Sequence, residues 1–259
     1  MKFKWLAGLC LGLGLISCAG GSKAPPLQNQ DQNQDAGGLW YGTLADAYWA
    51  SAGYPSLPKI EIASHSGTTG QAMSILAGNN LRMGGLYSGS YSIQGSNLTG
   101  TGTSFNANGS PATYNIAATV TTRTSVVSQS SCPCGDSGTS TVAYDTLYER
   151  PVSIASLAGI SKVSQATNDN KGTIWINSIS ISADGSFSGS ASTGAFTGSI
   201  TQIDSTKNLF NVSIQFTSTG VSATGLAFWS DGVSPNFAPN ALYLTWANSS
   251  WGAAAILTR

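Results

Sequence analysis

The chain has 259 residues, of which only 8% are charged, and its 11 basic residues balance its 11 acidic ones. A typical soluble domain has about 25% charged residues, so uncharged polar residues must keep this surface soluble. Without a basic cluster the chain has no footprint for nucleic acid, and without a polybasic stretch it has none for lipid headgroups.

The first segment has the pattern of an export signal. Lys2 and Lys4 precede an apolar run at residues 5–15, which glycines interrupt and which is too short for a comfortable membrane span. The run ends in Leu15-Ile16-Ser17-Cys18. We therefore expect residues 1–17 to be a cleaved signal peptide. An ordinary secretory signal with a chance cysteine is the alternative.

This motif resembles the lipobox of bacterial lipoproteins, Leu-x-Ser-Cys. The resemblance implies that Cys18 is lipidated and becomes the first mature residue, so that its acyl chains hold the protein in a membrane. Ala19, and not an aspartate, follows Cys18. In that family this implies a lipid anchor in the outer membrane of a Gram-negative cell, on either its periplasmic or its surface side.

Residues 18–36 are predicted to be the lipidated cysteine and a flexible linker. Two glycines and two prolines interrupt regular structure, and residues 28–35 contain only Gln, Asn and Asp. Such a segment cannot bury enough surface to offset the entropy lost on ordering.

From Gly37 onward the sequence predicts short β-strands. Val212, Ile214 and Phe216 alternate with polar residues, and a period of two places one set in a core. Asp184-Gly185 predicts a hairpin turn, because this pair tolerates positive φ. Only residues 44–51 and 150–156 could hold a turn or two of helix.

Glycines inside the predicted strands favour strongly curved barrels, because they permit coiling and close packing over aromatic rings. Residues 86–101 and 186–199 form a weak repeat, spaced by about 100 residues as in tandem domains of common size. We therefore predict an all-β fold with two small antiparallel β-barrel or sandwich domains in tandem, at residues 37–150 and 151–259.

The mature chain is similar to a little-characterised family of Gram-negative envelope lipoproteins with tandem β domains. The segments that carry the resemblance are GLWYGTL at 38–44, LYERP at 147–151, ISADGSFSG at 181–189 and GLAF at 225–228. The resemblance implies an envelope β-protein and no established activity. Members tend to have a cysteine near the position of Ala195, so a disulfide there is not expected in this chain.

Cys132 and Cys134 are the cysteines that remain after the signal peptide and Cys18. An oxidising envelope permits a disulfide between them, and its very small ring should make it reducible. A redox switch and a two-thiolate metal site are alternatives, but a metal site normally needs four ligands and the chain has one histidine. We favour a loop-tip disulfide or an inert pair, and expect no metal and no cofactor.

Catalytic groups are sparse. His65 has a turn-like setting and is expected to be an exposed loop residue, and no Gly-x-Ser-x-Gly motif supplies a nucleophile. Asp145 and Glu149 lie near Arg150, and a local ion pair explains them. We therefore expect that the protein is not an enzyme, and a secreted hydrolase is the least favoured reading.

Aromatic residues cluster at Trp40, Tyr41, Tyr48 and Trp49. They are the candidate contacts for a sugar or haem-like ligand, since a small barrel can hold one ligand. The alternative is a barrel-closing tryptophan with loop aromatics folded over the barrel mouth. The expected function is a non-catalytic, outer-membrane-anchored lipoprotein with a structural or binding role. The alternative is a surface receptor for a small ligand or a host protein.

Overall fold

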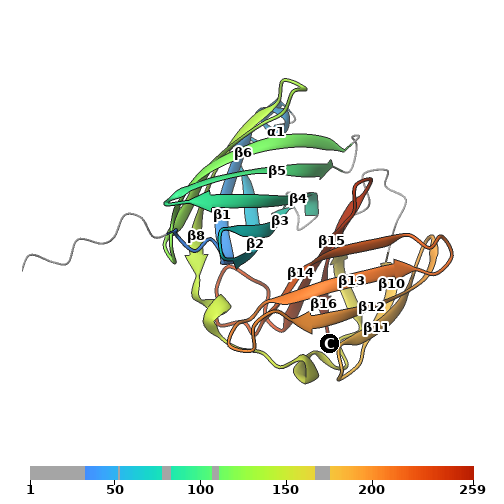
Figure 1. Cartoon of the computed structure of the whole chain (residues 1–259). Coiled ribbons are helices and arrows are strands. Elements are labelled where there is room, and N and C mark those ends of the chain that lie inside the picture. Colours follow the sequence, from blue (N-terminus) through green and yellow to red (C-terminus); the bar gives the residue numbers. More distant parts are fainter. Residues whose placement is uncertain (1–32, 52, 78–82, 107–110, 167–175) are drawn as a thin grey trace, which may run out of the picture. The chain divides into compact units, whose positions relative to one another are not determined.

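The computed structural model describes residues 33–259 apart from 52, 78–82, 107–110 and 167–175. The described chain is almost entirely antiparallel β-structure, arranged as two eight-stranded sheets in tandem (Figure 1). This confirms the predicted all-β class and the tandem arrangement. The predicted signal peptide, Cys18 and most of the linker lie outside the described residues. In the described part, no helix is long and apolar enough to cross a membrane.

The first sheet closes into a barrel, called barrel 1 here. Each strand pairs antiparallel with the next, and the first strand pairs with the eighth. The strands are β1 (Gly38–Asp46), β2 (Leu57–Ser66), β3 (Thr69–Ala77), β4 (Met83–Gln94), β5 (Asn97–Asn106), β6 (Ala112–Thr121), β7 (Ser125–Ser131) and β8 (Ser137–Asp145).

The second sheet is barrel-like and is called barrel 2 here. Its order is β10-β11-β12-β13-β14-β15-β16-β9, with β9 paired to β16 and no β9–β10 pairing among the described residues. Its strands are β9 (Lys162–Ala166), β10 (Ile176–Ile181), β11 (Ser186–Ala191), β12 (Gly194–Gln202), β13 (Phe210–Phe216), β14 (Ser222–Ser230), β15 (Ala241–Ala247) and β16 (Gly252–Thr258).

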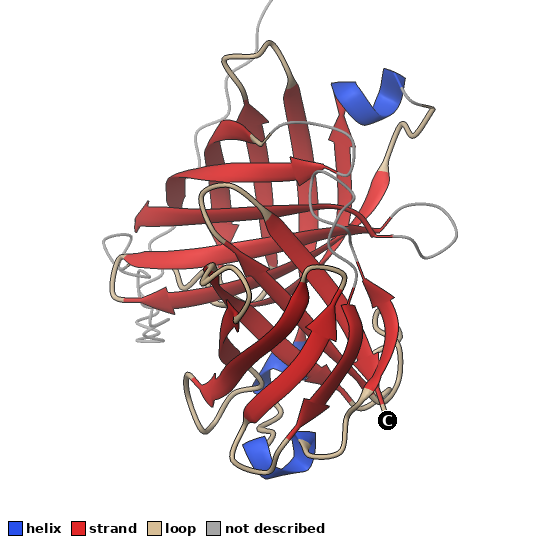
Figure 2. Ribbon diagram, turned by 90° about the vertical axis from the view of Figure 1, so that its right-hand side faces the viewer, coloured by secondary structure: helices blue, strands red, loops and turns tan. Residues whose placement is uncertain are grey.

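Helices in the described chain are short and lie between strands (Figure 2). They are α1 (Ala47–Ser51) and the 3-10 turns η2 (Thr146–Glu149) and η3 (Ile154–Leu157). The expected helix at 44–51 is thus limited to its second half, because residues 44–46 continue strand β1. The expected turn at 150–156 is replaced by η2 before it and η3 at its end.

The alternation predicted for the strands is confirmed. In β13, Val212, Ile214 and Phe216 are buried and the residues between them are exposed. The Asp184-Gly185 turn also forms, with Gly185 at φ 83° and the Asp184 carboxylate accepting the Ser186 N–H.

Strand glycines give room to aromatic rings, as the sequence predicts. A Cβ placed on Gly198 would lie 2.2 Å from Cζ of Phe187, and one on Gly189 would lie 2.4 Å from Cζ of Phe196. Both rings belong to the apolar core of barrel 2. Each ring therefore crosses a neighbouring strand where no side chain stands.

The repeat segments both form hairpins, β4–β5 and β11–β12. The first is made by the fourth and fifth strands of barrel 1. The second is made by the third and fourth described strands of barrel 2, when β9 is counted as the first. Each repeat segment is therefore a hairpin of two adjacent strands within its own sheet.

The two barrels share an apolar core. Strand β15 is buried on both faces: Leu242, Leu244 and Trp246 belong to the core of barrel 2. On its other face, Tyr243 belongs to a cluster with Leu39 and Ile60 of barrel 1. Asn33–Arg259 accordingly form one compact unit.

Candidate functional site in the lumen of barrel 1

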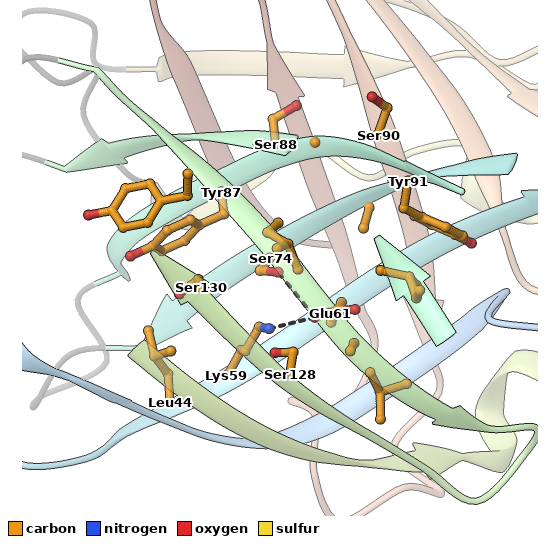
Figure 3. A pocket seen from close by; sticks show the side chains of 18 residues that line it. Leu44, Lys59, Glu61, Ser74, Tyr87, Ser88, Ser90, Tyr91, Ser128 and Ser130 are labelled. Carbon is orange, nitrogen blue, oxygen red and sulfur yellow. Dashed lines mark hydrogen bonds and ion pairs between the residues drawn. The ribbon is translucent and has the colours of Figure 1, made fainter. Parts of the chain in front are cut away.

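The middle of the inner face of β5 has no side chains, between the buried Leu98 and Ser104. Its sequence Thr99-Gly100-Thr101-Gly102-Thr103 turns glycines inward, while Thr99 and Thr101 are exposed. Gly102 pairs with Gly89 of β4, and both line a cavity of about 80 Å³ inside the barrel (Figure 3). The glycine pair therefore keeps this part of the lumen open.

A charged pair from β2 lines the same cavity. Lys59 and Glu61 are two residues apart, so the strand period places both on the inner face. Lys59 Nζ lies 2.6 Å from Glu61 Oε2, with 10% and 14% of the two side chains exposed. Ser74 Oγ contacts Glu61 Oε2 at 3.4 Å (Figure 3). Lys59 Nζ also donates to Ser140 Oγ at 3.1 Å.

The burial of this pair is costly. Removing two such charges from water costs several kcal/mol per ion, and their attraction offsets this only with good geometry and further hydrogen bonds. Glu61 Oε2 has two partners, whereas Oε1 has no hydrogen-bond partner among the described residues. A buried ion pair of this kind is weak evidence for stability, because the cost of removing its charges from water can exceed their attraction.

Two tyrosines flank the polar part of the cavity. The Tyr87 and Tyr114 rings meet edge to face with centroids 5.7 Å apart, and Tyr114 OH donates to Asp136 Oδ2 at 2.7 Å. Burial raises the pKa of both phenols far above the ordinary value, and nearby carboxylates raise it further. Both phenols are therefore neutral hydrogen-bonding groups at physiological pH.

His65 is not the exposed loop residue that the sequence predicts. It lies in β2, is half-buried, and stacks on Tyr91 with centroids 5.9 Å apart and planes 6° apart. Tyr91 in turn donates from its hydroxyl to the Ser64 carbonyl at 2.8 Å. The strand holds His65 inside the rim of the barrel, so it is part of the packing there.

Two of the aromatic ligand contacts suggested by the sequence, Trp40 and Tyr41, do not share a platform. Trp40 is fully buried, packs edge-on against Tyr144 and donates from Nε1 to the Ala36 carbonyl at 3.2 Å. Tyr41 lies on the other face of β1 and packs edge-on against Phe237. Tyr48 and Trp49 belong to α1, and their side chains lie outside the described residues.

Cys132 and Cys134 form a disulfide in the turn between β7 and β8, with their Cα atoms 5.0 Å apart. Cys132 N donates to the Asp136 carbonyl, and Cys134 is exposed. The pair therefore stands at a loop tip. Among the described residues, no three His, Cys, Asp or Glu side chains gather as a metal site.

The acidic residues near the junction of the barrels have long-range partners and not the local ion pair that the sequence predicts. Asp145 Oδ2 accepts from Ser234 Oγ at 2.6 Å and from Asn236 Nδ2 at 2.9 Å. Glu149 pairs with Lys207 and Arg123. These carboxylates fasten the end of barrel 1 to loops of barrel 2.

The sequence interpretation missed Lys59 and Glu61. In β2 they alternate with Ile60 and Ile62, and the usual assignment turns the charged face to water. Here the isoleucines face barrel 2 across the shared core, so the charged face turns into the lumen. The inward glycines of β5 were the one signal that this lumen would have room for polar groups.

Comparisons with known proteins supply no precedent: no family model matches the chain, and neither a curated protein nor a solved structure matches it.

Proposed function

We propose that the chain is a non-catalytic lipoprotein, anchored in the outer membrane through Cys18, with a structural or binding role at the cell envelope. The lipobox-like motif and the polar residues 19–35 support the anchor. The body that they carry is a pair of barrels with a shared core.

One structural observation carries this proposal: the end of the linker is fixed to one end of barrel 1. Gln34 N donates to the Gly95 carbonyl and Gly95 N donates to Asn33 Oδ1, both at 2.8 Å. Asp35 N donates to Thr122 Oγ1 at 2.7 Å. Gly95 and Thr122 lie in turns at the end of the barrel where β1 begins. An anchor at Cys18 would therefore attach to a defined end of the body.

The acids and bases that the sequence singles out have structural partners. His65 stacks on Tyr91, and Asp145 holds Ser234 and Asn236. Glu149 is held by Lys207 and accepts from Tyr144 OH at 2.6 Å. This use of the groups supports a non-catalytic role over that of a secreted hydrolase.

A surface receptor for a haem-like or sugar ligand is the alternative. Ligand pockets commonly measure about 300–1,000 Å³, and the lumen cavity of about 80 Å³ is too small for haem. The size of the lumen therefore supports placing any haem, host protein or envelope protein on the outer surface of the body.

The anchor is tested with Cys18→Ser, and with Cys10→Ser in the apolar run as the matched control. We expect the native protein and the Cys10→Ser variant to carry fatty acyl groups on the mature N-terminus and to sediment with outer membranes. We expect Cys18→Ser to accumulate as unlipidated precursor. Mass spectrometry that finds an unmodified N-terminus, or unchanged anchoring of Cys18→Ser, would overturn the proposal.

A further inference from the structure

We propose that the lumen of barrel 1 binds a small zwitterion, a molecule that carries one ammonium group and one carboxylate, of the size of alanine. The proposal concerns the Lys59–Glu61 cavity alone and does not depend on a lipid at Cys18. It gives the buried charge pair a role that stability does not explain.

The size of the cavity sets the size of the ligand. A cavity volume of about 80 Å³ has room for roughly six water-sized groups. Alanine and glycine have about that many non-hydrogen atoms, whereas sugars and most larger amino acids exceed it. The volume alone would also admit urea, glycerol or water, so the charges must decide among these ligands.

The charges favour a dipolar ligand. Lys59 Nζ has three donors, of which two are directed to Glu61 and Ser140. Glu61 keeps Oε1 without a described partner. A ligand carboxylate on Lys59 and a ligand ammonium on Glu61 would complete a square of alternating charges, and the contacts are strengthened because both side chains are largely buried. A simple cation would pair only with Glu61 and a simple anion only with Lys59, so either would leave a net charge buried in the lumen.

The rest of the lining suits the two ends and the small hydrocarbon part of such a ligand. Hydroxyls of Ser74, Ser128 and Ser130 line the cavity beside the charge pair. Ile116 and Val126 supply apolar surface in the same lining. The polar groups can orient a ligand while the apolar ones contact a methyl group.

Gly102 offers a variant that removes space without removing charge. A Cβ on Gly102 would lie 3.2 Å from the Ser88 carbonyl oxygen and 3.4 Å from Ile116 Cδ1. These contacts are tight but do not require the backbone to be rebuilt. Gly102→Ala should therefore fold and fill part of the cavity.

The test is binding of alanine and glycine to the mature chain, measured by calorimetry and by ligand-observed NMR after overnight incubation. Propionate, ethylammonium, urea and glycerol are the matched non-zwitterions. We expect saturable binding of alanine and glycine, and much weaker binding of the four others. Glu61→Gln and Lys59→Met should each weaken alanine binding about tenfold or more. Each substitution removes the partner of one charged end of the ligand, so that end would be buried and unpaired.

The controls separate binding from folding. The double variant Lys59→Met/Glu61→Leu removes both charges of the pair together, so neither is left without its partner and the variant should fold and not bind. Gly102→Ala should weaken alanine binding more than glycine binding, whereas Lys207→Met, in an ion pair outside the lumen, should change neither. The proposal is overturned if no zwitterion binds saturably, if propionate or glycerol binds as tightly as alanine, or if the folded double variant still binds.

Discussion

Gly252, the first residue of β16, lies directly against the ring of Phe105 in β5. A Cβ on Gly252 would come within 2.7 Å of Phe105 Cδ2 and 2.9 Å of Leu86 Cδ2. The glycine belongs to barrel 2 and the two apolar side chains to barrel 1. Their close approach is part of the core that the barrels share, and it depends on the missing side chain.

Gly252→Val should therefore loosen the contact between the barrels. We expect a loss of about 1–3 kcal/mol in the free energy of unfolding, the usual cost of overpacking a well-packed site. Urea denaturation measures it, with Ala117→Val on an exposed position of β6 as the control. Equal stability of the two variants would show that the contact carries no strain.

Asp145→Ala should cost more than removal of an exposed turn carboxylate. Three donors lose their acceptor: Ser234 Oγ, Asn236 Nδ2 and the Leu147 N–H. Hydrogen bonds to a buried charged group contribute about 1.5–3 kcal/mol, and we expect a loss in that range. Asp184→Ala, which removes contacts to Ser186 alone, should change the free energy of unfolding much less. Comparable losses in urea denaturation would argue against a fastening role for Asp145.

Glu149 should make stability depend on acidic pH. Burial acts to raise the pKa of this carboxyl, but hydrogen bonds from Lys207 and Tyr144 outweigh it and lower the pKa below the ordinary value. The charged form therefore stabilises the fold above the unfolded pKa of about 4.3, and this contribution disappears as pH falls through the lower folded pKa.

We expect Glu149→Gln to be less stable than the native chain at neutral pH and to approach it in strong acid. Thermal melts at a series of pH values measure the difference, and Lys207→Met should flatten the native acid dependence in the same way. Parallel curves for the native chain and Glu149→Gln would contradict this linkage.

Buried phenols should make the fold sensitive to alkali. Burial is the first cause that raises the pKa of six tyrosines, in the case of Tyr148 to about 12. The other five are Tyr87, Tyr91, Tyr114, Tyr144 and Tyr243. A phenol whose folded pKa is raised stabilises the fold below its unfolded pKa of about 10, and the contribution is lost as pH rises beyond it.

Absorbance at the phenolate band should therefore show these tyrosines ionising together with unfolding. The chain in concentrated urea should ionise near pH 10, the ordinary value, and serves as the reference. Gradual ionisation of all nine tyrosines of the folded chain near that pH, with an unchanged circular dichroism spectrum, would contradict the expectation.

Local chemistry in the sequence was sufficient for the strands and several turns. The alternation at Val212, Ile214 and Phe216 predicts a strand with one buried face, and Asp184-Gly185 predicts the turn between β10 and β11, because both depend on neighbours in sequence. The glycines paired with Phe187 and Phe196 likewise followed from the need for room beside a ring.

The candidate site could not be predicted in the same way. The two-residue repeat of a β-strand predicts that Lys59 and Glu61 share a face. Only the packing of Ile60 and Ile62 against barrel 2 decides that this face is turned into the lumen. Trp40 and Tyr41 are adjacent in sequence and were grouped as a cluster, although adjacent residues of a strand point to opposite faces. Asp145 accepts hydrogen bonds from Ser234 and Asn236, which lie far along the chain, and no local sequence pattern predicts such partners.

The fixed position of Asn33 limits how far the body could travel from a bilayer. If Cys18 carries acyl chains, fifteen peptide steps connect them to Asn33, and even a fully extended chain of that length spans only about 50 Å. A macromolecule that binds the end of barrel 1 to which the linker is attached must then come within about 50 Å of the lipid surface. Shortening or lengthening residues 19–32 would change the maximum distance between the lipid and barrel 1 without altering either barrel.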